Sequence, residues 1–347
     1  MAASNTVRIA GLGVSGSALA MFLAERGFQV EAYDPSGFYS KPCGDAVSVR
    51  PWISRLLYDL DTVITGVRRY TIMINGRKIA SVEYSSDNWL IIDKHRLVHS
   101  MRRQAEKLGV RLIRGNASPP CGCTRGCFCV DARGPYAHKR STWILTVRHI
   151  LEARDRWNPE EALIDFLPEM GGLYWAFPAS DDGRLVNAGA GWMGGRFESS
   201  RKLSLERSKQ VLGSFEVIDE KAAPIAVFSP IRLASKGSFA VGEAAGLVMS
   251  TSGEGNRPGL ESARALAESL ESSEDLDEAA QYYTEKVKPL VSEARASRIG
   301  LGIALRFPGL FKRVARGLPV EFWRDYLSSR LTLEKASLYM FMLPVYL

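Results

Sequence analysis

Apolar and polar positions alternate at the start of the chain in an order that predicts strand, turn, helix and strand. An apolar run at 7–10 predicts a buried strand, and glycines follow it at positions 11, 13 and 16. Small and apolar residues at 17–26 then continue as a helix that Gly27 ends. A second strand is predicted at 28–34, and its last residue is Asp34.

The rest of the chain shows the same two periodicities. Positions 62–84 alternate as a hairpin does, with Asn75 and Gly76 at the turn. Positions 142–228 are β-rich, the acidic and serine-rich 268–278 is predicted as a solvated turn, and helices follow to the end. Strands are also predicted at 90–93, 110–114, 186–192 and 238–241, and helices at 95–108, 203–212 and 258–270.

The order of strand, glycine turn, helix, strand and acid is typical of a dinucleotide-binding fingerprint. Gly11 permits the tight turn, Gly13 lets the backbone approach a pyrophosphate, and Gly16 lets the helix lie close to the sheet. Asp34 ends the second strand, where it is placed to accept from a ribose hydroxyl. Glycine-rich turns also occur with no ligand, so the prediction of dinucleotide binding depends on the helix and the acid that follow the turn. The predicted contacts are Gly11, Gly13, Val14, Ser15, Gly16 and Asp34.

A second glycine-rich stretch follows the strand predicted at 238–241. Gly242 and Glu243 come directly after it, so the carboxylate can reach a ribityl chain. The next helix start can point its N–H groups at the pyrimidine end of a flavin. A nicotinamide enzyme could have the first turn alone, so the second one favours FAD and a discontinuous nucleotide domain. The contacts predicted here are Gly242, Glu243, Gly253, Glu254, Gly255 and Asn256.

Length and composition fit a folded protein with two sizeable cores. The 347 residues are 46% hydrophobic and 24% charged. The N-terminus has no basic region followed by an apolar stretch, which predicts that there is no signal peptide. The apolar run at 336–347 includes Pro344 and is too short to span a bilayer. We therefore expect a cytoplasmic protein.

Much of the net charge of +7 comes from one late segment. Residues 294–320 contain six basic residues and no acid, with apolar residues between them. This pattern suits an anionic membrane surface and predicts peripheral association with the inner face. A helical subdomain with a solvated basic face explains the pattern equally well. No recognised nucleic-acid-binding module is present, so nucleic acid is not an expected partner.

Four of the five cysteines lie within 121–129. A hairpin with Gly126 in a left-handed conformation would pair Cys123 with Cys127 and Cys121 with Cys129. Cross-strand disulfides, a structural metal site and four reduced thiols are the competing interpretations. The spacing differs from the usual zinc knuckles, so disulfides or free thiols are favoured and no metal is predicted.

Three further motifs lie between the two glycine turns: Lys41-Pro42-Cys43-Gly44, Asp131-Ala132-Arg133-Gly134 and Trp175-Ala176-Phe177-Pro178. With the glycine turns, Asp34 and the run 242–246, their order across about 7–270 resembles the geranylgeranyl reductase family. That family belongs to the FAD-dependent fold shared with p-hydroxybenzoate hydroxylase. The glycine turns are general to the flavin fold, whereas the motifs at 41–44 and 175–178 narrow the resemblance to the reductases.

The resemblance implies an FAD enzyme that hydrogenates isoprenoid double bonds. Substrates in the family are archaeal membrane lipid precursors, as for digeranylgeranylglycerophospholipid reductase, or the prenyl tails of chlorophyll and quinones. An external donor, NAD(P)H or ferredoxin, reduces the flavin. Glu243 stands where the family usually has Asp, and Lys94 where an Arg is common. The resemblance assigns Cys43 and Gly44 to the flavin ring and catalysis, Lys41, Lys94 and Asp131 to the cofactor, and Trp175, Phe177 and Pro178 to the lipid pocket.

An isolated alkene accepts hydride poorly, so we expect an acid to protonate one carbon while flavin N5 delivers hydride to the other. Cys43 is the first candidate for that acid, although a single cysteine is more often a small buried residue. Trp175 and Phe177 could equally belong to the core. The competing functions are an FAD-dependent monooxygenase of a small aromatic substrate and a non-catalytic protein that binds flavin or lipid.

The predicted fold class is α/β, with an FAD-binding Rossmann-like domain, an inserted β-rich substrate domain and a helical C-terminal segment. The FAD-binding domain is predicted at 1–60, 88–135 and 232–290, the substrate domain at 61–87 and 136–231, and the helical segment at 291–347.

Overall fold

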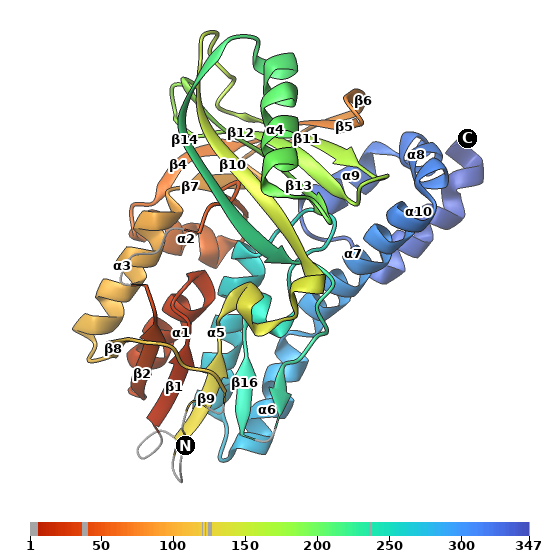
Figure 1. Cartoon of the computed structure of the whole chain (residues 1–347). Coiled ribbons are helices and arrows are strands. Elements are labelled where there is room, and N and C mark those ends of the chain that lie inside the picture. The colour runs from red at the N-terminus through yellow and green to blue at the C-terminus, as the bar shows by residue number, and fades with distance from the viewer. Residues whose placement is uncertain are drawn as a thin grey trace.

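The protein is described by a computed structural model, which shows two large sheets, a small sheet and a group of C-terminal helices (Figure 1). It describes residues 6–36, 41–119, 121, 123, 127–235 and 237–346. The fold class is the predicted mixed α/β class with a parallel Rossmann-like sheet.

The Rossmann-like sheet has six strands in the order β15-β16-β9-β1-β2-β8. All neighbours in it are parallel except β15 and β16, which are antiparallel. The strands are β1 (Thr6–Ala10), β2 (Gln29–Asp34), β8 (Arg111–Arg114), β9 (Cys127–Asp131), β15 (Ala234–Ser235) and β16 (Ser238–Ala240). Helix α1 (Val14–Glu25) packs against α3 (Lys94–Lys107) and α5 (Asn256–Ser272), and one apolar core joins these helices to the sheet.

The second sheet has seven strands in the order β14-β10-β13-β12-β11-β5-β6. They are β5 (Arg69–Ile74), β6 (Arg77–Glu83), β10 (Trp143–Ala153), β11 (Glu161–Leu167), β12 (Gly172–Pro178), β13 (Leu185–Met193) and β14 (Phe215–Ala226). Helix α4 (Phe197–Leu212) packs on β10 and β13. The predicted hairpin turn is confirmed, because Asn75 and Gly76 both have positive φ, at 50° and 78°.

A three-stranded sheet of β3 (Ala46–Ser48), β7 (Trp89–Ile92) and β4 (Val63–Val67) adjoins helix α2 (Pro51–Asp59). The alternation at 62–84 therefore feeds two different sheets, since β4 pairs with β7 whereas β5 and β6 join the seven-stranded sheet. Helix α2 was not predicted, although Ile53, Leu56 and Leu57 follow a helical spacing and Ile53 and Leu57 are buried.

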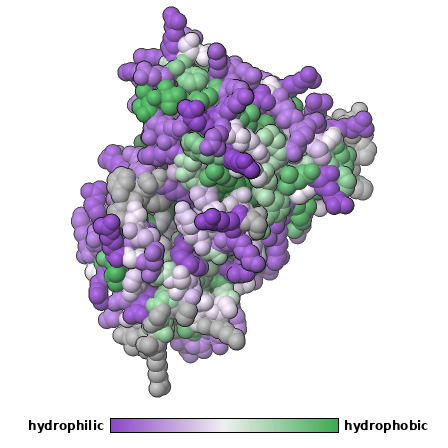
Figure 2. Space-filling view, in the orientation of Figure 1, coloured by the Kyte–Doolittle hydropathy of each residue, from purple (hydrophilic) through white to green (hydrophobic). Residues whose placement is uncertain are grey.

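Five helices end the chain: α6 (Leu276–Lys286), α7 (Lys288–Arg306), α8 (Pro308–Gly317), α9 (Val320–Leu327) and α10 (Leu333–Tyr346). The predicted solvated turn at 268–278 is mostly wrong, because α5 runs to Ser272 and the Asp275 side chain caps the start of α6. A hydrophobic area covers part of these helices at the right of the molecule (Figure 2). Among the described residues, no helix is both long enough and apolar enough to cross a membrane.

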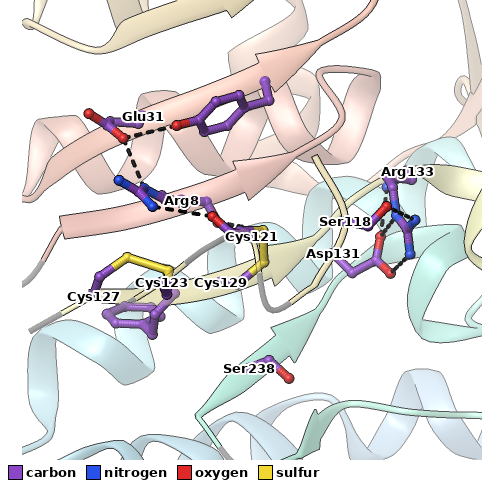
Figure 3. Close-up of a disulfide and its surroundings, with 12 residues drawn as sticks. Arg8, Glu31, Ser118, Cys121, Cys123, Cys127, Cys129, Asp131, Arg133 and Ser238 are labelled. Carbon is purple, nitrogen blue, oxygen red and sulfur yellow. Dashed lines mark hydrogen bonds and ion pairs between the residues drawn. A yellow bond between two sulfur atoms is a disulfide. The ribbon is translucent and has the colours of Figure 1, made fainter. Parts of the chain in front are cut away.

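The clustered cysteines form two disulfides, Cys121–Cys129 and Cys123–Cys127 (Figure 3). The pairing is the predicted one, but the described residues before β9 form no strand opposite it. The reason is that β9 already pairs in parallel with β1 on one edge and β16 on the other. The predicted left-handed Gly126 lies outside the described residues. Over the described part of the chain there is no cluster of metal-ligating side chains.

Candidate active site

Strands β1, β2, β9 and β16 run in the same direction, so their carboxyl ends meet at one edge of the Rossmann-like sheet. Gly11 directly follows β1 with φ +97°, and a Cβ there would lie 2.6 Å from the carbonyl oxygen of Ala132. A Cβ on Gly16 would lie 1.9 Å from the carbonyl oxygen of Gly11. Both positions therefore require glycine, and the turn stays tight enough for a ligand to approach the backbone.

Asp34 is held at the carboxyl end of β2 beside this turn. Its Oδ2 accepts the Leu12 N–H at 2.9 Å, and its Oδ1 accepts the Ser36 N–H at 2.9 Å. The guanidinium of Arg102 lies 3.5 Å from Oδ2 and donates to the carbonyl oxygen of Leu12 as well. The carboxylate is thus fixed at the position where the fingerprint expects a ribose.

The two glycine turns pack against each other although 226 positions separate Gly16 from Gly242. Gly242 begins the short 3-10 helix η3 (Gly242–Ala245) with φ +58°, and a Cβ there would lie 2.1 Å from Ser15 Oγ. A Cβ on Gly259, in the first turn of α5, would lie 2.5 Å from the same oxygen. Small residues therefore let η3, α5 and the first turn meet at one place.

Glu243 connects the second turn to two other segments. Its carboxylate accepts from Lys41 Nζ at 2.7 Å and from the backbone N–H of Ala226 at 2.8 Å. His138 Nε2 lies 2.7 Å from the Glu243 carbonyl oxygen. Glu243 consequently fixes the start of the 41–44 motif against the end of β14.

Cys43 lies in a polar cluster that sequence reasoning found only in part. Its thiol donates to Asp45 Oδ1 at 3.1 Å, and Asn256 Nδ2 lies 3.6 Å from Sγ. Asn187 Nδ2 donates to the Cys43 carbonyl oxygen at 2.8 Å and to Asp45 Oδ2 at 3.0 Å, and Lys94 Nζ lies 3.5 Å from Oδ1. Burial and the nearby carboxylate raise the pKa of the Cys43 thiol, and Lys94 only partly opposes them.

Asp45 is the centre of this cluster and has an unusual backbone. Its φ is +57°, in the left-handed region that residues other than glycine rarely adopt. Such conformations persist only where the surroundings fix them, and they occur often at functional sites. Asp45 directly follows the 41–44 motif, which was the available sequence signal, whereas Asn187 lies in a glycine-rich strand with no signal of its own.

The Trp175 and Phe177 side chains face this cluster from β12. Trp175 Nε1 donates to Asn187 Oδ1 at 3.0 Å, and a Cβ on Gly44 would lie 2.7 Å from the Phe177 ring. Because side chains alternate along a strand, Pro178 shares the opposite face with Tyr174 and Ala176, which belong to a different core. Pro178 therefore does not line the site.

One cavity of about 1430 Å³ connects these features. It extends from the glycine turn and Asp34, past Cys43, to apolar side chains of β11, β12, α7, α8 and α9. All predicted site residues line it except Gly16, Asp131, Pro178 and Gly242. Asp131 instead binds the Arg133 guanidinium at 2.8 and 2.9 Å, and the two glycines are covered by the turn itself.

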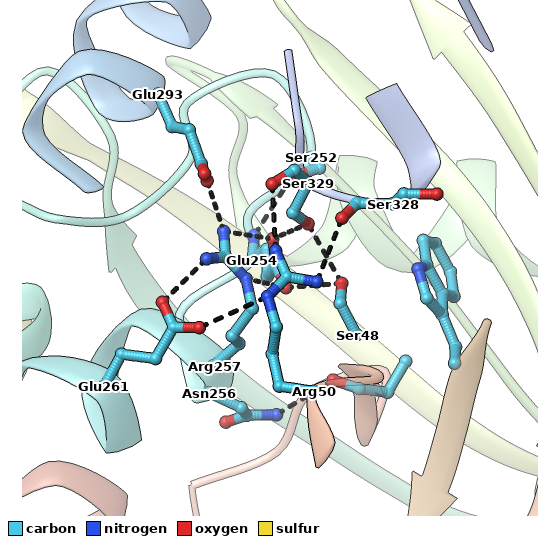
Figure 4. Close-up of polar contacts among 12 residues, drawn as sticks. Ser48, Arg50, Ser252, Glu254, Asn256, Arg257, Glu261, Glu293, Ser328 and Ser329 are labelled. Carbon is cyan, nitrogen blue, oxygen red and sulfur yellow. Dashed lines mark hydrogen bonds and ion pairs between the residues drawn. The ribbon is translucent and has the colours of Figure 1, made fainter. Parts of the chain in front are cut away.

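Glu254, predicted as a cofactor contact, belongs to a buried ion cluster (Figure 4). It accepts from Ser48 and Ser329, both at 2.8 Å, and from Arg257 Nε at 3.1 Å. Arg257 is 1% exposed and also pairs with Glu261 at 2.8 Å and Glu293 at 2.6 Å. Burial favours a protonated Glu254, but Arg257 and the hydroxyls outweigh it and lower its pKa.

At Glu293, which also lines the cavity, burial outweighs the attraction of the guanidinium group. Burial raises its pKa to about 7 despite Arg257, and the carboxylates of Glu254 and Glu261 add to the effect. Arg50 joins the cluster 3.5 Å from Glu261. Three carboxylates thus share two guanidinium groups, which leaves the pKa of Glu293 near neutral pH. Sequence reasoning missed this cluster because its members come from α5, α7, the loop before α5 and the segment after β3.

This architecture is the FAD-binding fold of geranylgeranyl-reductase-like and p-hydroxybenzoate-hydroxylase-like flavoproteins. A geranylgeranyl bacteriochlorophyll reductase-like protein from Thermoplasma acidophilum superposes with a TM-score of 0.73 at 15% identity, over 97% of this chain and 95% of that one. The flavin-dependent brominase Bmp2 gives a TM-score of 0.71 at 12% identity, over 99% and 98%.

PqsL from P. aeruginosa, in complex with 2-aminobenzoylacetate, gives a TM-score of 0.62 at 16% identity, over 89% of this chain and 99% of that one. No protein-family model matches the chain, and no curated protein matches it in sequence. At these identities the similarity shows the fold alone.

The residues present fit FAD, the cofactor that this fold implies. The turn at Gly11 and Gly16 would be filled by any Cβ, so the backbone stays accessible to a pyrophosphate. Asp34 and Glu243 supply the carboxylates that hydroxyl groups of a dinucleotide need, and both line the same cavity. The cavity then continues beyond Cys43, which leaves room for a second molecule.

Proposed function

We propose that this protein is an FAD-dependent oxidoreductase that saturates C=C bonds in the isoprenoid chain of a lipid. The observation that carries the proposal is the single cavity, which joins a glycine-lined cradle to an apolar end. Ile164, Phe166, Phe311 and Trp323 line that end, and apolar side chains make up most of the cavity wall. A long hydrocarbon chain suits such a site better than a small charged molecule does.

In this proposal FAD, when bound, supplies the hydride. The chain's own residues hold the alkene in a dry pocket and provide the proton for its other carbon. Cys43 suits the second role because its raised pKa keeps the thiol protonated at neutral pH. Asp45 and Asn187 orient the thiol and the adjoining backbone, and Trp175 fixes Asn187 from the substrate side.

The proposal is tested by adding FAD to the purified protein and recording its visible spectrum. The reduced holoprotein is then mixed anaerobically with a geranylgeranyl lipid, and we expect the flavin to reoxidise as a saturated product forms. We expect Cys43→Ala to keep FAD but to slow reoxidation by roughly 10²-fold or more, the usual contribution of a positioned acid. Failure to bind FAD would refute the cofactor assignment, and FAD binding without lipid-dependent reoxidation would refute the substrate.

Oxygen chemistry is the second candidate, because a brominase and PqsL share the fold at similar TM-scores. Mixing the reduced holoprotein with oxygen, bromide and small aromatic compounds distinguishes the two. A hydroxylated or halogenated product would favour this alternative, whereas a saturated lipid from the anaerobic reaction would favour the reductase. A protein that binds flavin and lipid without turnover would give neither product.

A further inference from the structure

The apolar end of the cavity opens at the outer face of α7 and α8. Ile299, Ile303 and Leu310 all line the cavity, yet they are 52%, 41% and 55% exposed. Side chains that face both the cavity and solvent mark its mouth. Phe307, between the two helices, is 50% exposed and extends the apolar rim. The rim lies among the C-terminal helices, where Figure 2 shows hydrophobic surface.

Basic side chains share the face that carries this rim. On α7, Arg295 lies four residues before Ile299, and Arg306 lies three residues after Ile303. The helical period therefore places all four side chains on one side of α7. On α8, Arg313 and Arg316 follow Leu310 at intervals of three residues and are likewise exposed. The opposite side of α8 carries Phe311 and Ala315, which face the cavity.

These four arginines are not neutralised within the described part of the protein. The segment 294–320 contains no acid, and no carboxylate among the described residues pairs with Arg295, Arg306, Arg313 or Arg316. The other two basic residues of the segment are engaged, since Lys312 pairs with Glu169 and Arg298 donates to the Ser229 carbonyl oxygen. Apolar surface flanked by free cations is a feature of proteins that bind anionic membranes.

We propose that the α7–α8 mouth is a docking surface for an anionic lipid bilayer. The arginines contact lipid phosphates, and the half-exposed apolar rim enters the headgroup region. The mouth then opens directly onto acyl chains, so a membrane-resident substrate reaches the cavity without crossing water. Docking to the membrane is argued from the charges and the rim alone. Only the entry of substrate depends on the proposed function.

The test is sedimentation of the purified 347-residue chain with vesicles of phosphatidylcholine, with or without phosphatidylglycerol. We expect binding to the anionic vesicles, weak binding to the neutral ones, and loss of binding as salt increases. Combined Arg313→Gln and Arg316→Gln should weaken binding roughly thirtyfold, since each basic residue near the surface contributes roughly fivefold. Ile299→Asp and Leu310→Asp should weaken it by a similar factor through the rim.

Matched controls distinguish an effect of the α7–α8 mouth on vesicle binding from a general effect of surface charge or hydrophobicity. Arg103→Gln with Lys107→Gln removes the same charge from the exposed face of α3, and Ile218→Asp changes an isoleucine on β14 that is 51% exposed. Both controls should bind vesicles as the unchanged protein does. Equal losses in control and mouth variants, or binding that is indifferent to salt, would overturn the proposal.

A second copy of the chain is the alternative occupant of this face. No vesicle binding, together with a dimer in solution that Ile299→Asp dissociates, would assign the face to self-association and refute docking. None of these readouts needs FAD or turnover. The docking proposal can therefore be refuted while the proposed reaction holds, and the proposed reaction can be refuted while docking holds. Vesicle binding with normal FAD uptake but no reaction would keep docking and reject the reductase.

Discussion

At the scale of single residues, the chemistry of the site depends on how Asp45 holds Cys43. The thiol donates to Asp45 Oδ1, and the Asp45 N–H donates back to Sγ, both at 3.1 Å. A negative carboxylate beside a half-buried thiol disfavours the thiolate, whereas the Lys94 ammonium favours it. The protonation state of Cys43 is therefore a balance between two identified neighbours and burial.

We predict that Asp45→Asn makes Cys43 more reactive toward an alkylating reagent. Removing the carboxylate lowers the thiol pKa, so alkylation should be several-fold faster at mildly alkaline pH, and its pH profile should move to lower pH. Lys94→Met should move the profile the other way. Alkylation reports on this site because Cys43 is the one free thiol in a structure whose other four cysteines form disulfides.

The measurement is the alkylation rate as a function of pH, followed by mass spectrometry without reductant. Asp93→Asn is a suitable control, because Asp93 caps α3 beside Lys94 but makes no contact with the thiol. A profile unchanged by Asp45→Asn would show that the carboxylate does not control the thiol.

At the scale of elements, the Arg257 cluster joins the C-terminal helices to the Rossmann-like domain. Its members come from β3, α5, α7, the loop before α5 and the segments after β3 and α9. We predict that Arg257→Met destabilises the protein by about 3–5 kcal/mol, because it leaves carboxylates buried without their main partner. Chemical denaturation of the apoprotein measures this loss.

Arg264 supplies the matched comparison, since it lies on the same helix and pairs with Glu268 four residues later. Its side chain is 40% exposed, against 1% for Arg257. Arg264→Met should cost no more than about 1 kcal/mol, as usual for an exposed ion pair. Equal losses in the two variants would mean that burial does not set the strength of the cluster.

The same scale shows which parts could be predicted from sequence. The β1-α1-β2 unit has local signals, glycines at fixed positions, so it was found with its ends nearly right. The Asn-Gly signal gave the turn of the β5-β6 hairpin, but the predicted start at 62 was wrong because 63–67 forms β4 of another sheet. Helix α2 was missed although Ile53, Leu56 and Leu57 follow a helical spacing. The supposed cysteine hairpin failed because strand pairing is decided by β1 and β16, which lie far away in sequence.

In the candidate site, too, residues in local motifs could be predicted and residues brought in by tertiary packing could not. Glycine turns, the 41–44 motif and the aromatic residues of β12 reach one cavity and were recognisable as motifs. Asn187 reaches Cys43, and Glu293 reaches the cavity beside Arg257, only through tertiary packing, across 144 and 36 residues of sequence, respectively. The predicted domain boundaries and the roles assigned to individual site residues stay predictions.

At the scale of the whole molecule, Glu293 couples global stability to pH. Its pKa is about 7 in the folded protein, against 4.5 for an ordinary Glu side chain. The folded state therefore holds the proton over a range of pH where the unfolded state has lost it. Its contribution to stability is complete below about pH 4.5 and is lost as the pH rises through about 7, so the unfolding free energy should fall across this window.

We predict that Glu293→Gln removes this dependence. An amide keeps an acceptor for Arg257 but has no proton to lose, so the difference in unfolding free energy between about pH 5 and about pH 8 should change by up to about 3 kcal/mol. The comparison with the variant is needed because His149, whose pKa is lowered by burial, contributes with the opposite sign.

Denaturant titrations at the two pH values measure the effect, with Glu285→Gln as the control. Glu285 is exposed and pairs with Lys288 on the surface, so its variant should follow the unchanged protein. Identical pH dependence in all three proteins would show that Glu293 is ionised throughout. The cavity wall would then carry a full negative charge at neutral pH beside the apolar end, where the proposed lipid would have to bind against an unneutralised carboxylate.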